Sequence, residues 1–104
     1  MDTEQICFEM ICHVGEARSS FIEAIQQARQ RNFVRARELI DSGKESYNLG
    51  HAVHARLIQA EMEGEIEHLS LILMHAEDQM MSAENFKILS EEFFALYQCI
   101  DSKE

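Results

Sequence analysis

The sequence predicts an all-α protein, and three observations carry this prediction. The chain of 104 residues contains no proline and only four glycines, so it lacks the residues that most often end helices or form turns. Glutamate, alanine, leucine, isoleucine, glutamine, methionine and arginine dominate the composition, and most of them are good helix formers. Apolar residues also recur at three- and four-residue steps over long stretches, which is the spacing of an amphipathic helix.

The first predicted helix covers residues 3–31. Its start carries Glu4 and Glu9, and negative charge suits the positive end of the helix dipole. One apolar stripe runs along it, made of Ile6, Met10, Val14, Ala17, Phe21, Ala24 and Ala28. A polar joint at residues 30–32 ends the helix, and Asn32 is a suitable cap for the helix that follows.

The second predicted helix covers residues 33–62 and contains Gly43 and Gly50 inside its apolar pattern. Each glycine costs about 1 kcal/mol relative to alanine in a helix interior. No proline or turn dipeptide marks a stop, so we expect the helix to continue through both glycines. Gly64 forms the second joint, and the third predicted helix covers residues 66–100. Long helices joined by short turns lie antiparallel, so residues 1–104 are expected to form one three-helix domain.

The third helix is too apolar for a helix with one face in water. Its first turns contain Leu69, Leu71, Ile72, Leu73 and Met74, whose side chains spread round most of the cylinder. In a three-helix monomer each helix leaves one face exposed. The excess apolar surface therefore favours self-association, most simply as a closed cyclic oligomer built through this helix.

Charge and cysteine usage exclude several function classes. The formal net charge is −10, which disfavours nucleic-acid binding through a basic surface. No stretch approaches the roughly 20 apolar residues that a membrane span needs, and the acidic N-terminal stretch does not resemble a signal peptide. Cys7, Cys12 and Cys99 are odd in number and are interpreted as reduced thiols, so we expect a cytoplasmic protein.

A strip of polar residues crosses the most apolar helix. Advancing about 100° per residue places four other polar side chains within about 60° of His75: His68, Asp78, Gln79 and Ser82. Glu77 falls on the opposite side. Helical geometry alone favours a hydrogen-bonded polar set that fixes helix register somewhat over a working site. A neutral imidazole is a nucleophile near neutral pH, so His75 suits the relay of a labile group such as a phosphoryl group.

Three metal interpretations also arise from spacing. Glu65 and His68 match the Glu-x-x-His half-motif of di-iron bundles, but only one copy is present. His51 and His54 lie three residues apart and are better explained as surface histidines than as metal ligands. If copies of the third helix surround a symmetry axis, Asp78 would meet its copies there, and carboxylate oxygens favour a hard ion such as Mg²⁺.

The chain resembles the enzyme IIA component of the lactose/cellobiose (and chitobiose) family of the bacterial sugar phosphotransferase system. The run LILMHAEDQMM, residues 71–81, is similar to the family's apolar run followed by His-Ala-Gln-Asp-His-Leu-Met. The sequence GEARS at residues 15–19 is a second match, and LIQAE at residues 57–61 followed by EGE at residues 63–65 is a third. The three matches occur in the family's order and spacing, and the resemblance covers nearly the whole chain.

The resemblance implies a fold, a reaction and partners. Members are three-helix bundles that assemble as homotrimers of nine helices. The histidine matching His75 accepts a phosphoryl group from the histidine-containing phosphocarrier protein and passes it to a cysteine of enzyme IIB, during uptake of a β-linked disaccharide. The aspartate matching Asp78 lies at the trimer axis with one divalent metal, usually Mg²⁺. Gln79 and His68 are candidate orienting groups for His75.

Two departures from the family's pattern bear on the site. Gln79 stands where the family commonly has a second histidine, and it can form hydrogen bonds but cannot titrate. Glu77 replaces a glutamine on the far side of the helix. The alternative from another class is a non-catalytic helical adaptor or oligomerisation module, whose apolar third helix is a docking face.

Overall fold

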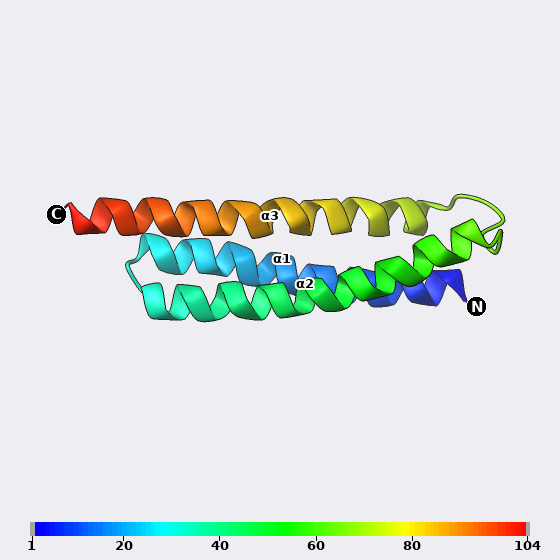
Figure 1. Cartoon of the computed structure of the whole chain (residues 1–104), viewed down its shortest axis with the longest axis horizontal. Coiled ribbons are helices and arrows are strands. Elements are labelled where there is room, and N and C mark those ends of the chain that lie inside the picture. Colours follow the sequence, from blue (N-terminus) through cyan, green and yellow to red (C-terminus); the bar gives the residue numbers. More distant parts are fainter. Residues whose placement is uncertain (1, 104) are drawn as a thin grey trace.

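The computed structural model describes residues 2–103 and contains three long helices joined by two loops (Figure 1). They are α1 (Thr3–Arg29), α2 (Phe33–Met62) and α3 (Leu71–Ser102). α2 runs antiparallel to both neighbours, so α1 and α3 point in the same direction, and the molecule is a rod of 58 × 18 × 16 Å. The predicted all-α, antiparallel three-helix arrangement is therefore confirmed.

The joint between α1 and α2 covers residues 30–32. α1 begins at an Asp2 cap whose carboxylate accepts a hydrogen bond from the Gln5 amide at 3.2 Å. It ends at Arg29 rather than at Arg31, because Arg31 takes a φ of 66° and turns the chain. Asn32 occupies the cap position of α2, but its side-chain amide donates to Gln27 Oε1 at 2.9 Å instead of capping the helix.

α2 is continuous through both glycines, as predicted, and the reason is close contact with α1. A Cβ atom on Gly43 would lie 2.6 Å from Phe21 Cε1, and one on Gly50 would lie 2.7 Å from Val14 Cγ1. Phe21 and Val14 are fully buried. Glycine at these two positions thus lowers the helix propensity of α2 but allows α1 and α2 to approach closely.

α3 begins at Leu71, so the prediction that it starts at residue 66 is wrong. Residues 63–70 form a loop, in which Gly64 takes a φ of +75°. Ser70 is the cap, with extended backbone, and its hydroxyl accepts a hydrogen bond from the Leu73 amide at 3.2 Å. The apolar periodicity continues through the loop, which concealed the helix start. α3 ends at Ser102, two residues later than predicted.

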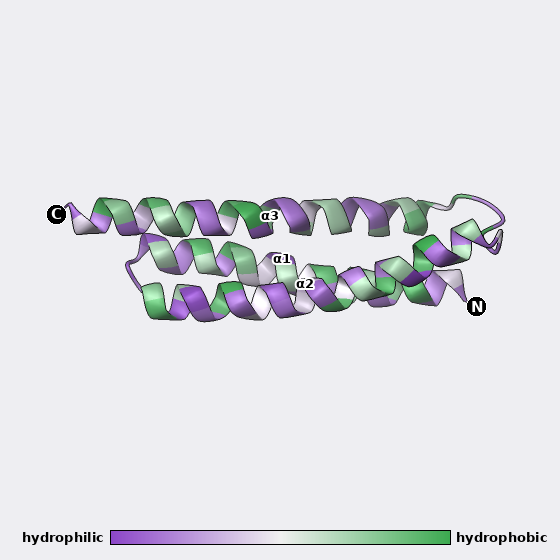
Figure 2. Cartoon of the chain, viewed as in Figure 1, coloured by the Kyte–Doolittle hydropathy of each residue, from purple (hydrophilic) through white to green (hydrophobic). Residues whose placement is uncertain are grey.

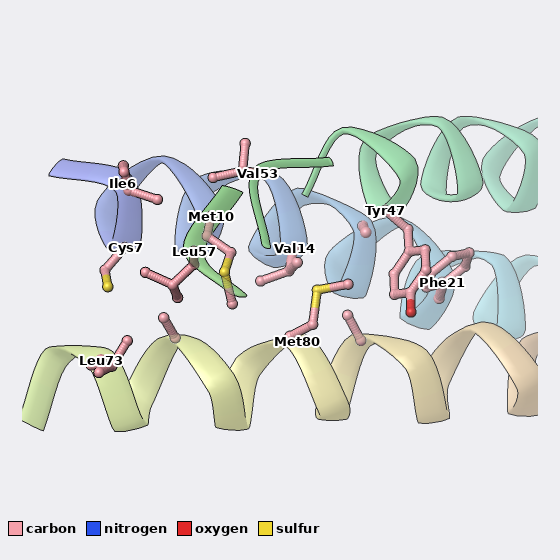
Figure 3. Packing of buried hydrophobic residues seen from close by; sticks show 13 residues of the cluster. Ile6, Cys7, Met10, Val14, Phe21, Tyr47, Val53, Leu57, Leu73 and Met80 are labelled. Atoms are coloured by element: carbon pink, nitrogen blue, oxygen red, sulfur yellow. The ribbon is translucent and has the colours of Figure 1, made fainter. Parts of the chain in front are cut away.

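The core lies where α1 packs against its two neighbours. One cluster surrounds Met10, Val14, Tyr47, Leu73 and Met80 at the end where α3 starts (Figure 3), and a second lies towards the other end. α2 and α3 contact each other less than either contacts α1. Apolar residues recur along all of α3 (Figure 2), although only six of its side chains are buried: Leu73, Ala76, Met80, Ala83, Ser90 and Phe94.

Polar contacts join α2 to α3 near both ends. Arg37 donates two hydrogen bonds to Glu91, at 3.1 and 3.2 Å, and Lys44 Nζ lies 2.6 Å from the same carboxylate. At the other end His54 Nε2 donates to Glu77 Oε1 at 2.8 Å. In the part of the chain that the structure describes, no helix has the length and apolar character of a membrane span.

Candidate functional site

His75 lies in the second turn of α3 with its side chain exposed to solvent. Leu73 and Ala76 on either side of it are buried in the core, so the backbone that carries His75 is anchored while the imidazole faces outward. Asp78 is also exposed, and Gln79 and Ser82 are half-buried. The helix therefore brings His75, Asp78, Gln79 and Ser82 to one side of α3, as their spacing predicts.

His68 does not belong to this strip, and its placement there is wrong. The helical phase that put it beside His75 assumed a helix from residue 66, whereas His68 lies in the loop before α3. It lines a shallow pocket at the chain's start with Thr3, Glu4, Glu65, Ser70 and Ile72, among others. Within residues 2–103, no hydrogen bond joins His68 to His75 or Gln79.

Asp78 borders an apolar pocket of about 350 Å³ between the end of α2, the loop and the start of α3. Apolar side chains form most of its wall, namely Leu57, Ile58, Ile66, Leu69, Leu73, Met74 and Met81. The carboxylates of Glu61, Glu77 and Asp78 complete the lining. The structure thus places the Asp78 carboxylate beside exposed apolar side chains such as Met74 and Met81.

Glu77 projects away from His75 towards α2, where it meets His54. The His54 side chain is only 19% exposed, against 45% for Glu77. Sequence reasoning treated His54 as a surface histidine, although its position next to buried Val53 indicates a side chain at the edge of the core.

Burial raises the pKa of the Cys7 thiol, and the negative charges of Glu77 and Glu4 raise it further.

The structure shows the surroundings of the residues that spacing suggested as metal ligands. Glu65 and His68 lie in a loop, so they lack the helix that the di-iron half-motif requires. The His51 ring lies 6.2 Å from the Tyr47 ring, while His54 contacts Glu77, so the two histidines have separate partners. Among the described residues, no group of three or more histidine, cysteine or acidic side chains could hold a metal ion.

The outward side of α3 exposes a row of large apolar side chains. It consists of Leu71, Met74, Met81, Ile88, Leu89, Phe93, Leu96 and Ile100, which we call the α3 apolar face. Asp78 lies within this row, since it is one turn from Met74 and one turn from Met81. Leu71 is 82% exposed and therefore does not shield His75 from water in a single chain.

The sequence and the fold both match those of a known family. The family model for the lactose/cellobiose-specific IIA subunit of the PTS (phosphotransferase) system matches residues 5–98. The chain belongs to this family. It is therefore a phosphotransferase component, as the resemblance implied.

Relatives within the PTS IIA family cover almost the whole chain. The chain is 37% identical over 95 residues to the oligo-β-mannoside-specific IIA component of Bacillus subtilis, spanning 91% of this chain and 86% of the relative. It is 31% identical over 98 residues to the N,N′-diacetylchitobiose-specific IIA component of Escherichia coli, spanning 93% and 84% of the two chains.

Solved structures of IIA proteins have the same fold. The cellobiose-specific enzyme IIA of Bacillus anthracis superposes with a TM-score of 0.95 at 38% identity, over 100% of this chain and 95% of that one. The chitobiose IIA protein in its solution complex with HPr superposes with a TM-score of 0.83 at 26% identity, over 97% and 98% of the two chains.

Proposed function

We propose that this chain accepts a phosphoryl group on His75 and passes it on during sugar uptake. The observation that carries the proposal is the exposed imidazole of His75 on a backbone anchored by buried Leu73 and Ala76. A nucleophile that serves two protein partners in turn must be reachable, and it must also be held in a fixed position. The family membership then supplies the type of reaction.

The proposed transfer is a displacement at phosphorus. The unprotonated ring nitrogen of His75 forms the new N–P bond, and the bond to the donor's nitrogen breaks with its electron pair remaining on the donor. The onward transfer reverses these roles, with a cysteine thiolate of the acceptor attacking the phosphorus. Gln79, one turn after His75, is the proposed orienting group. Its side-chain amide can donate a hydrogen bond to a phosphoryl oxygen both while the group is transferred to His75 and while it is transferred onward.

The proposed donor is the histidine-containing phosphocarrier protein, and the proposed acceptor is enzyme IIB. The solved complex of the chitobiose IIA protein with HPr supports the first assignment, since this chain has the same fold as that IIA protein. Both partners and the three reduced cysteines favour a cytoplasmic location. The relatives' names, which include oligo-β-mannoside, lichenan and lactose, support a β-linked disaccharide as the sugar.

We propose a homotrimer formed through the α3 apolar face, giving nine helices in all. Exposed apolar rows of this length on a helix favour burial against another surface, and three copies of α3 around an axis would cover each other. Asp78 would then meet its two copies. A single chain would supply only one Asp78 carboxylate at the axis, whereas three chains would supply the oxygen ligands that suit one Mg²⁺ per trimer.

His75→Ala tests the phosphoryl-carrier function. The variant removes an exposed side chain, so we expect it to fold like the wild type and to take up no phosphate. The measurement is intact-protein mass spectrometry after incubation with phosphoenolpyruvate and the general phosphotransferase proteins. Wild-type protein should gain one acid-labile phosphate, and His68→Ala should label normally as the matched control.

Two results would contradict the proposal. Full labelling of His75→Ala would move the phosphate to another residue. An unlabelled wild-type chain would favour the non-catalytic adaptor, for which the α3 apolar face would be the docking surface.

A further inference from the structure

We infer that His54 is a positioning residue for phosphoryl transfer, acting through its hydrogen bond to Glu77. The bond ties the first turns of α3 to α2 and so fixes the direction in which His75 and Asp78 point. This inference rests on the proposed function of His75. It gives a role in the transfer to Glu77, which lies on the opposite side of α3 from His75, and to its partner His54 in α2.

α3 packs less extensively against α2 than against α1, so a polar contact between α2 and the start of α3 adds to the anchoring by buried Leu73 and Ala76. An eight-residue loop, residues 63–70, precedes the helix. The apolar pocket of about 350 Å³ separates the end of α2 from the first turns of α3. Before Met80, only Leu73 and Ala76 of α3 are buried. Apolar packing at this end of the α2–α3 contact is therefore limited to a few side chains, among them Leu57 of α2 and Leu73 and Ala76 of α3.

The His54–Glu77 bond crosses the edge of that pocket. Its 2.8 Å length is short for a nitrogen–oxygen hydrogen bond and suits a carboxylate acceptor. His54 is held on its own side, because the neighbouring Val53 and Leu57 are both buried. Within residues 2–103, this hydrogen bond is the polar contact that joins α2 to the half of α3 carrying His75. The ion pairs of Arg37 and Lys44 with α3 involve Glu91, which lies more than three helical turns after Glu77.

The tie controls His75 through the rotation of the helix. Glu77 is two residues after His75, so the two side chains leave α3 on opposite sides, about 160° apart. Holding Glu77 against α2 therefore turns His75 outward and keeps Asp78 in the α3 apolar face. Without the hydrogen bond, the packing of Leu73 and Ala76 alone would set the rotation of these turns, and we expect small shifts of His75 and Asp78.

The test compares variants that remove the bond with variants that keep it. His54→Ala removes the donor, whereas His54→Gln retains an amide donor and Glu77→Gln retains an oxygen acceptor. His51→Ala is the matched control, since it deletes an exposed histidine on the same helix, one turn earlier. For each full-length variant we would measure the rate of His75 phosphorylation at limiting and at saturating phosphocarrier protein, together with thermal unfolding.

We expect His54→Ala to lower the saturated rate about tenfold, because small misplacements of a reacting group reduce rates steeply. The concentration of phosphocarrier needed for half-saturation should change little. His54→Gln and Glu77→Gln should recover most of the rate, and His51→Ala should match the wild type. His54→Ala combined with Glu77→Ala should be no slower than His54→Ala alone.

Each contrary result has a distinct meaning. A wild-type rate in His54→Ala, with the wild type itself labelled, would overturn the positioning role and leave the proposed function intact. An equally slow His54→Gln would overturn the hydrogen-bond argument. A rate loss that only follows the unfolded fraction would make the bond purely structural. A wild-type chain that takes no phosphate would overturn both proposals.

Discussion

Glu91 of α3 is contacted by two cationic side chains of α2. It accepts two hydrogen bonds from Arg37 and contacts Lys44, while the Arg37 guanidinium lies 4.5 Å from the centre of the Phe94 ring. The hydrogen bond from Arg37 is the main cause that lowers the pKa of Glu91 below its ordinary value of 4.5, with a further contribution from Lys44. The ionised form is thus favoured in the folded state.

A lowered pKa predicts loss of stability in acid. The carboxylate of Glu91 stabilises the fold above its unfolded pKa, near 4.5, and this contribution disappears as pH falls through the lower folded pKa. Because the side chain is 35% exposed, we expect Glu91→Gln to lower the free energy of unfolding by only about 1 kcal/mol at pH 7. Urea unfolding of both proteins at pH 7 and at pH 3 checks this, since the difference should be smaller at pH 3 than at pH 7.

The three cysteines differ in burial, and this predicts their reactivity. Cys7 is fully buried and its thiol has a raised pKa, whereas Cys12 is exposed. We expect Cys7 to react with a thiol-alkylating reagent at neutral pH at least about a hundredfold more slowly than Cys12. Peptide mass spectrometry over a time course measures both rates, and equal rates at the two positions would contradict the packing around Cys7.

At the level of helices, the sequence patterns predicted α1 and α2 more accurately than α3. The stripes of α1 and α2 stop at polar residues, so their ends are within two residues of the prediction. Residues 66–70 include Ile66 and Leu69, which continue the apolar spacing, and the start was therefore placed too early. The serine cap at Ser70 was the available signal, since serine is a preferred residue immediately before a helix.

The glycines of α1 and α2 allow a matched pair of stability measurements. Gly43→Ala forces a Cβ against the buried Phe21 ring, so we expect the free energy of unfolding to fall by about 1–3 kcal/mol. Gly15→Ala has no atom within 4 Å of the added Cβ, so better helix propensity should raise the free energy by up to about 1 kcal/mol. Thermal denaturation followed by circular dichroism distinguishes the two, and equal effects would contradict the close α1–α2 contact.

At the level of the whole molecule, the apolar residues that the sequence places along α3 form an exposed apolar face in the structure. The sequence predicted self-association from this excess, and a single chain does leave the face uncovered. The strip of His75, Asp78 and Gln79 could likewise be predicted from helical spacing. The partnership of His54 and Glu77 could not, because it depends on the register of α2 against α3, which periodicity within each helix does not define.

Asp78→Leu tests the proposed trimer and its metal together. Three carboxylates at an axis repel one another unless a cation binds, whereas three leucines would pack. We expect the variant to be a trimer that is insensitive to a chelator, and the wild type to dissociate more readily when Mg²⁺ is removed. Sedimentation equilibrium with and without chelator measures this. A monomeric Asp78→Leu variant would contradict the axial placement of Asp78.

The parallel course of α1 and α3 has a practical consequence for labelling the protein. His75 lies at the end of the rod where α1 begins, since Thr3 and Glu4 line a pocket with Ile72 at the start of α3. The far end of α3, at Ser102, is about 40 Å away at 1.5 Å per residue. A fluorophore or surface tether attached after Ser102 would leave the histidine accessible to large partners, whereas one attached before Thr3 would obstruct their approach.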